Sequence, residues 1–246
     1  MRVRTELVVA LISAGVALAS AGLSVWGQMR STRLAAEFQR LRLAEQRRIE
    51  SEKAAARYRE PLARAAYDLQ SRFYNILEQN LLVAYFDHGD ERERSYVVDN
   101  TAFLVAQYFA WTEIIRRDIQ YINLGQDAET RRLAQLQDEI YSLFQTDRFD
   151  PVFRVFAGEQ RAIGERMIRD GPRGPECMGY GAFLDQLNKG VDPLTEDLRS
   201  DVRKLSGPNG ARPRLVALQH ALIDLLTFLD PDFIRFPKER RTKVPG

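Results

Sequence analysis

An uncharged run from Leu7 to Trp26 limits what this chain can fold into more than any other feature. Twenty residues in an α-helix, at a rise of about 1.5 Å each, just cross a hydrocarbon core of about 30 Å. The run contains only Leu, Ile, Val, Ala, Gly and Ser before Trp26, a residue type that favours the membrane–water interface. We therefore predict one transmembrane anchor over residues 1–27, with the lipid bilayer as a partner.

A cleaved signal peptide is the alternative for the same segment. Arg2 and Arg4 give it a basic start, and residues 19–21 (Ala-Ser-Ala) fit the small-residue pattern of a cleavage site. The apolar run nevertheless continues beyond that site to Trp26, and a signal sequence usually has an apolar region of only about 7–15 residues. We therefore favour a retained, single-pass anchor in the cell membrane.

The arginines beside the run predict its orientation. Two precede it, whereas six follow it: Arg30, Arg33, Arg40, Arg42, Arg47 and Arg48. Basic residues beside a span favour the cytoplasmic side, so we expect the C-terminal domain on the cytoplasmic face. The single cysteine, Cys177, agrees with this, because secreted domains of this size often carry paired cysteines.

Residues 28–60 contain neither Gly nor Pro and are rich in Ala, Arg, Glu and Leu. This composition predicts a helical stalk that continues the membrane helix. Leu34, Phe38 and Leu41 form a short apolar seam, which Glu45 interrupts before a long coiled coil is established. We expect a solvated single helix, with dimerisation near the seam as the alternative.

Small residues within the anchor recur at spacings of three and four. A stripe of this kind lets the backbones of two membrane helices approach closely, and its members are Ala10, Ala14, Ala17 and Ala21. It favours a homodimer through the membrane helix. The alternative is an anchor that is simply rich in alanine.

Residues 61–236 form the predicted domain, and a basic tail follows at 237–246. Apolar periodicity, capping residues and terminal glycines predict helices at about 61–86, 90–124, 127–146, 150–169, 192–205 and 214–229. We expect connectors at 171–181 and 206–213. No alternating run indicates a strand, so the fold class is all-α, a helical bundle. The second helix is apolar almost all round, which predicts a buried central position.

No motif for catalysis, phosphate binding or dinucleotide binding is present, and we expect neither enzymatic activity nor a cofactor. His88 lies in an acidic turn and His220 among leucines, so neither predicts a metal site, which needs three or four convergent ligands. Cys177 has no basic neighbour that would activate it. A formal net charge of +2 gives no indication of a nucleic-acid partner.

One set of polar residues interrupts otherwise apolar helices. Its members are Tyr67, Asn100, Gln107, Glu159 and Arg161. Buried polar groups must be hydrogen-bonded, so these residues are candidates for a network across the bundle that fixes helix register. The alternative is a polar pocket for a small ligand.

Several stretches resemble an uncharacterised bacterial group of single-pass, membrane-anchored helical proteins. They are residues 58–62, 66–75, 106–113 and 158–164, and the resemblance covers most of the domain. It implies no activity and no residue role. From the sequence we expect a membrane-tethered helical module that binds or scaffolds a protein partner. A small-ligand sensor or an enzyme using a polar pocket is the alternative.

Overall fold

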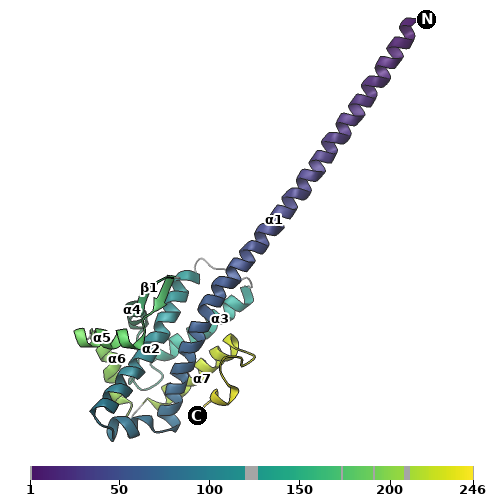
Figure 1. The fold of residues 1–246 in the computed structure, drawn as a ribbon. Helices are drawn as coiled ribbons and strands as arrows, with labels where there is room; N and C mark the ends of the chain where they lie inside the picture. The colour runs from purple at the N-terminus through teal and green to yellow at the C-terminus, as the bar shows by residue number, and fades with distance from the viewer. Residues whose placement is uncertain (1, 120–126, 173, 191, 208–210, 246) are drawn as a thin grey trace. The chain divides into compact units, whose positions relative to one another are not determined.

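The computed structural model describes residues 2–119, 127–172, 174–190, 192–207 and 211–245, although not every side chain within them. This part of the chain is mostly helical and contains two short strands, so the all-α class is confirmed (Figure 1). The chain divides into two compact units, Met1–Glu50 and Ser51–Gly246.

The first unit contains the N-terminal part of α1, the helix Arg2–Glu78. The described side chains from residue 28 to residue 46 are all exposed, among them Leu34, Phe38 and Leu41. Most side chains of the predicted anchor, including Ala10, Ala14, Ala17 and Ala21, lie outside the described residues. In the part that was described, no helix has both the length and the apolar character needed to cross a membrane.

The second unit begins within α1 rather than at a new helix. Pro61, the predicted start, lies inside α1. Tyr58 and Leu62 on either side of it are buried in the core, and this packing offsets the backbone hydrogen bond that a proline removes. α1 ends at Glu78, earlier than the predicted Phe86, because Asn80 adopts a left-handed backbone conformation with φ of 53°. A short π-helix, η1 (Val83–Asp87), follows.

α2 (Glu91–Ile119) is the buried central helix that the sequence predicted. It starts at the predicted position with a capping box, because the Asp90 amide donates to Glu93 at 2.9 Å and the Glu93 amide donates to Asp90 at 2.8 Å. α2 packs against η1, α4, α5, α6 and β2. Its buried apolar side chains include Val97, Val105 and Phe109.

α3 (Asp127–Gln145) packs against α7 (Arg212–Leu229), and a buried arginine joins them. The Arg214 guanidinium donates to the carbonyl oxygens of Leu143 and Phe144 at the end of α3, at 2.7 and 3.1 Å. It also donates to the carbonyls of Thr146 and Asp150 at 3.0 and 2.9 Å. A cation at a helix C-terminus satisfies carbonyls that otherwise have no partner.

The predicted helix from Asp150 is wrong in its first turn. Asp150 accepts a hydrogen bond from the Val152 amide at 2.8 Å, which closes a turn, and Phe153 has a φ of 60°. Phe153 is fully buried, so core packing compensates for this rare conformation. The helix α4 starts later and runs over Ala157–Met167, where Glu159 accepts from the Phe156 amide at 2.8 Å.

The predicted connector at 171–181 and the expected absence of strands are also wrong. β1 (Ile168–Gly171) and β2 (Gly174–Cys177) form an antiparallel hairpin in which Ile168 pairs with Cys177. α5 (Tyr180–Lys189) follows, a helix that was not predicted. α6 (Pro193–Lys204) begins as predicted, because Asp192 accepts hydrogen bonds from the two amides that follow Pro193, at 3.1 and 3.2 Å.

The predicted basic tail is packed against the domain. Phe236 and Val244 are buried, and Arg241 forms a buried ion pair with Asp230. The Val244 amide donates to Gln219 of α7 at 3.2 Å. The short helix η2 (Lys238–Arg240) lies between Phe236 and Val244 in the sequence. We call residues 230–245 the C-terminal clasp.

Candidate functional site

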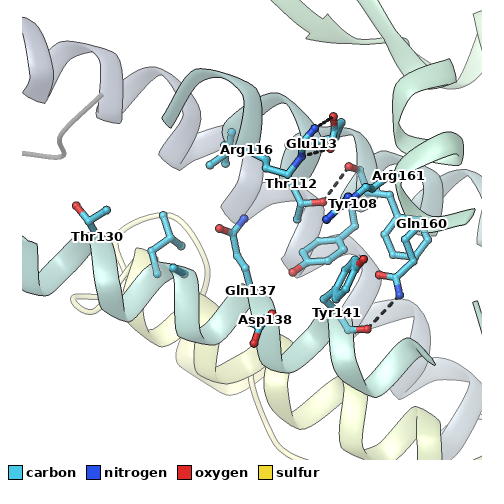
Figure 2. Close-up of a pocket in the computed structure, with 14 residues that line it drawn as sticks. Tyr108, Thr112, Glu113, Arg116, Thr130, Gln137, Asp138, Tyr141, Gln160 and Arg161 are labelled. Atoms are coloured by element: carbon cyan, nitrogen blue, oxygen red, sulfur yellow. Dashed lines mark hydrogen bonds and ion pairs between the residues drawn. The ribbon is translucent and has the colours of Figure 1, made fainter. Parts of the chain in front are cut away.

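A pocket of about 380 Å³ lies between α2, α3 and α4 (Figure 2). α2 and α3 each contribute six lining residues, and α4 contributes two. The lining residues are Tyr108, Phe109, Thr112, Glu113, Ile115, Arg116, Thr130, Leu133, Ala134, Gln137, Asp138, Tyr141, Gln160 and Arg161. The volume is within the range of about 300–1,000 Å³ that is usual for small-molecule sites.

The apolar wall of the pocket is part of the domain core. Phe109, Ile115 and Leu133 line it, and all three are buried. The Phe109 ring also makes an edge-to-face contact with Phe144 of α3, with ring centroids 4.9 Å apart. The wall is therefore fixed by aromatic packing and is pre-formed.

The Tyr108 hydroxyl is the most unusual polar group of the pocket. Tyr108 is only 2% exposed, and its hydroxyl has no hydrogen-bond partner among the described residues. Burial raises the pKa of Tyr108 above its usual value, so the hydroxyl remains protonated and is able to donate. Buried polar groups are nearly always hydrogen-bonded, and Tyr108 is a residue that lines the cavity.

A second unpaired donor comes from the facing helix. The Gln137 amide nitrogen is buried and has no partner in the described part of the chain. Figure 2 shows the side chains of Tyr108 and Gln137 extending into the space between α2 and α3. By contrast, the Gln160 amide donates to the carbonyls of Tyr141 and Val155, both at 3.0 Å, and so ties α4 to α3.

Glu113 is a buried carboxylate whose charge is fully compensated. Arg116 donates to both of its oxygens at 2.7 Å, and Arg117 donates at 2.7 Å as well. Burial alone would raise the pKa of Glu113, but the hydrogen bonds and charges of the two arginines outweigh burial and lower it. Glu113 is therefore ionised at neutral pH and is already fully engaged.

The remaining charges in the lining belong to exposed side chains. Arg161 and Asp138 are both exposed, and neither forms an ion pair with another described residue. Water screens charges in such positions, so they contribute little to the field inside the pocket.

The pocket is lined by several kinds of polar group. They are hydroxyl, amide, guanidinium and carboxylate groups, and the lining contains neither His nor Cys. Across the described residues, no group of three His, Cys, Asp or Glu side chains is placed to hold a metal ion.

The five residues of the predicted polar network do not meet in one place. Tyr67 stacks on Phe236 with ring centroids 4.6 Å apart, Asn100 accepts a hydrogen bond from Arg72, and Glu159 caps α4. The Gln107 side-chain oxygen is buried without a partner among the described residues. Arg161 alone of the five lines the pocket.

Of the two residues that the sequence analysis missed, Gln137 had a recognisable signal in the sequence and Tyr108 did not. Leu133, Leu136 and Ile140 mark the buried face of α3, and Gln137 interrupts it four residues after Leu133. A polar residue at helical spacing on an apolar face indicates either a core hydrogen bond or a site. Tyr108 lies within the apolar run of α2 and gave no such signal.

The histidines and the cysteine lie outside the pocket. His88 is exposed in the turn before α2, and the His220 ring is hydrogen-bonded to the Val244 carbonyl at 2.8 Å. Burial raises the pKa of Cys177 to about 12, so its thiol is not activated.

Comparison with known protein families, with curated proteins and with solved structures finds no match to this chain.

Proposed function

We propose that this protein is a membrane-tethered helical module that binds a small ligand in the pocket between α2, α3 and α4. The observation that supports the proposal is that two residues lining a cavity of about 380 Å³ have buried donors without a partner among the described residues, the Tyr108 hydroxyl and the Gln137 amide nitrogen. A bound acceptor would satisfy donors whose burial otherwise destabilises the fold. A pocket for a small ligand is the alternative that the sequence left open, although Tyr108 and Gln137 were not among the residues named for it there.

Binding is tested with full-length protein in lipid nanodiscs and three naphthalene derivatives: 2-acetonaphthone, 2-naphthoate and 2-ethylnaphthalene. Equilibrium dialysis against empty nanodiscs measures the protein-bound fraction. Ala134 lines the pocket, so Ala134→Trp should fill it and abolish binding. Ala128→Trp is the matched control, because Ala128 is exposed on the same helix and does not line the pocket. Failure of all three compounds to bind, or equal loss in both variants, would contradict the proposal.

The membrane tether rests on the sequence. The uncharged run Leu7–Trp26 has the length of a membrane-spanning helix, and the arginines after it favour a cytoplasmic domain. We expect the mature protein to resist carbonate extraction and to have an intact mass that includes residues 1–26. A soluble product that begins near Gly22 would show that the segment is a cleaved signal peptide.

Scaffolding through a second copy of the chain is the second candidate. Leu34, Phe38 and Leu41 are 47%, 63% and 66% exposed, which leaves the apolar seam of the stalk without cover in the single chain. A dimer that continues the Ala stripe of the anchor would bury it. Replacing Ala14 and Ala21 by Ile should abolish association in a membrane two-hybrid assay, whereas Ala19→Ile should not. An unchanged signal in the Ala14 and Ala21 variant would show that the anchor does not mediate dimerisation through the Ala stripe.

A further inference from the structure

Two buried side-chain groups of pocket-lining residues are available as hydrogen-bond donors. The Gln137 amide nitrogen can only donate, and the protonated Tyr108 hydroxyl donates to any acceptor within reach. Both come from facing helices into one space, as Figure 2 shows. A ligand group with two lone pairs, such as a carbonyl oxygen, is able to accept from two donors on facing helices.

The charges of the pocket select against an ionised ligand. The lining contains two acidic and two basic side chains, Glu113 and Asp138 against Arg116 and Arg161. The buried Glu113 is already neutralised by Arg116 and Arg117. A charged ligand would therefore lose its water at the inner end without gaining a buried counter-ion, which is strongly unfavourable.

The walls and the volume select for a compact apolar body. Phe109, Ile115 and Leu133 offer apolar and aromatic surface, and about 380 Å³ is near the lower end of the range for ligand sites. A body of two fused rings, or an alkyl chain of similar size, suits such a space.

We infer that the ligand is a neutral, apolar carbonyl compound whose oxygen accepts hydrogen bonds from Tyr108 and Gln137. This inference rests on the proposed function and adds the chemical class of the ligand. The acceptor belongs at the inner end, between α2 and α3, and the apolar body lies against the wall formed by Phe109 and Leu133.

The same three compounds test the inference, because they share a ring system and differ in one group. We expect 2-acetonaphthone to bind at least tenfold more tightly than 2-naphthoate, and also more tightly than 2-ethylnaphthalene. Tyr108→Phe and Gln137→Met should each weaken the binding of 2-acetonaphthone by about tenfold, the effect of one lost hydrogen bond. Neither should weaken the binding of 2-ethylnaphthalene, which has no acceptor. Near-ultraviolet circular dichroism checks that both variants remain folded.

Arg131→Gln is the matched control for charge. Arg131 is exposed on α3 and does not line the pocket, so its loss should leave the binding of all three compounds unchanged. Tighter binding of 2-naphthoate that depends on Arg161 would overturn the inference and leave the proposed pocket standing. Unchanged ketone binding in both Tyr108→Phe and Gln137→Met would also overturn it. Absence of binding by all three compounds would reject the proposed function itself.

Discussion

Individual residues differ widely in how much of the fold depends on them. Arg214 holds four carbonyl oxygens in a fully buried position, whereas the Gln107 side-chain oxygen is buried with no partner in the described part of the chain. Replacing Arg214 would leave these backbone carbonyls without their donor. Replacing Gln107 by Leu would remove a buried oxygen that has no donor among the described residues. The cost of a buried polar side chain therefore depends on its partners rather than on its depth.

Phe109 of α2 lies in the core of the domain. It is 2% exposed and packs edge-to-face on Phe144, so Phe109→Ala removes a large side chain from the centre of the core. We expect a loss of about 3–5 kcal/mol in the free energy of unfolding. Urea unfolding measures it, with the exposed Tyr96→Ala on the same helix as the control. Equal effects in the two variants would mean that α2 is not the centre of the domain.

The close approach of α4 to α2 depends on one glycine. A Cβ atom built on Gly164 would lie 2.6 Å from the carbonyl oxygen of Phe109. Backbone cannot yield as a flexible side chain does, so the two helices would have to separate.

Gly164→Ala should therefore destabilise the domain by about 1–3 kcal/mol, even though alanine is the better helix former. Thermal unfolding followed by circular dichroism measures the change. Gly158→Ala in the same helix is the matched control, since a Cβ there meets no atom within 4 Å. A Gly164→Ala protein as stable as the Gly158→Ala protein would contradict this packing.

Two Asp-Pro pairs show how far local sequence determines an element. Asp192 begins a helix as predicted, because its carboxylate bonds the amides of the first turn. Asp150 also accepts an amide hydrogen bond, but the burial of Phe153 directs the chain into a turn. The same dipeptide thus has two outcomes, and contacts distant in the sequence decide between them. Capping interactions join residues a few positions apart and were therefore predictable. The start of α4 depends on the burial of Phe153 and was not predictable from the local sequence.

The candidate site was less accessible to prediction than the helices. The central helix α2 followed from its own apolar pattern, and the capping box of Asp90 and Glu93 from its spacing. The pocket depends on how three helices pack, and Tyr108 and Gln137 are 29 positions apart in the sequence. No pattern within one helix specifies which of its polar residues faces a cavity. The polar residues chosen from the sequence therefore lie mostly elsewhere.

The C-terminal clasp makes the stability of the protein depend on pH. Asp230 accepts hydrogen bonds from the Ile234, Arg235 and Phe236 amides and pairs with Arg241. Burial alone would raise its pKa, but the Phe236 and Arg235 amides and the Arg241 guanidinium outweigh burial and lower it. A lowered folded-state pKa gives stability that is present above the ordinary value of about 4 and is lost as the pH falls further.

We therefore expect the clasp to loosen below about pH 4, with faster amide hydrogen exchange at Phe236 and Val244. Asp230→Asn should exchange faster at neutral pH already and show a weaker dependence on acid. Asp232→Asn is the control, because Asp232 lies in the same segment and is not a member of the Asp230–Arg241 ion pair. Identical pH profiles for Asp230→Asn and the unmodified protein would exclude Asp230 as the source.

The clasp also fixes an order of events during synthesis. The Gln70 side chain donates to the Arg240 carbonyl across 170 positions of sequence, and the Arg59 guanidinium donates to the Leu229 carbonyl across another 170. The first helix of the domain is thus completed by contacts with segments that the ribosome makes 170 residues later. Such long-range closure slows folding, and until then the apolar face of α1 has no permanent cover. If the N-terminal run is a membrane anchor, the protein is tethered well before its domain is able to close.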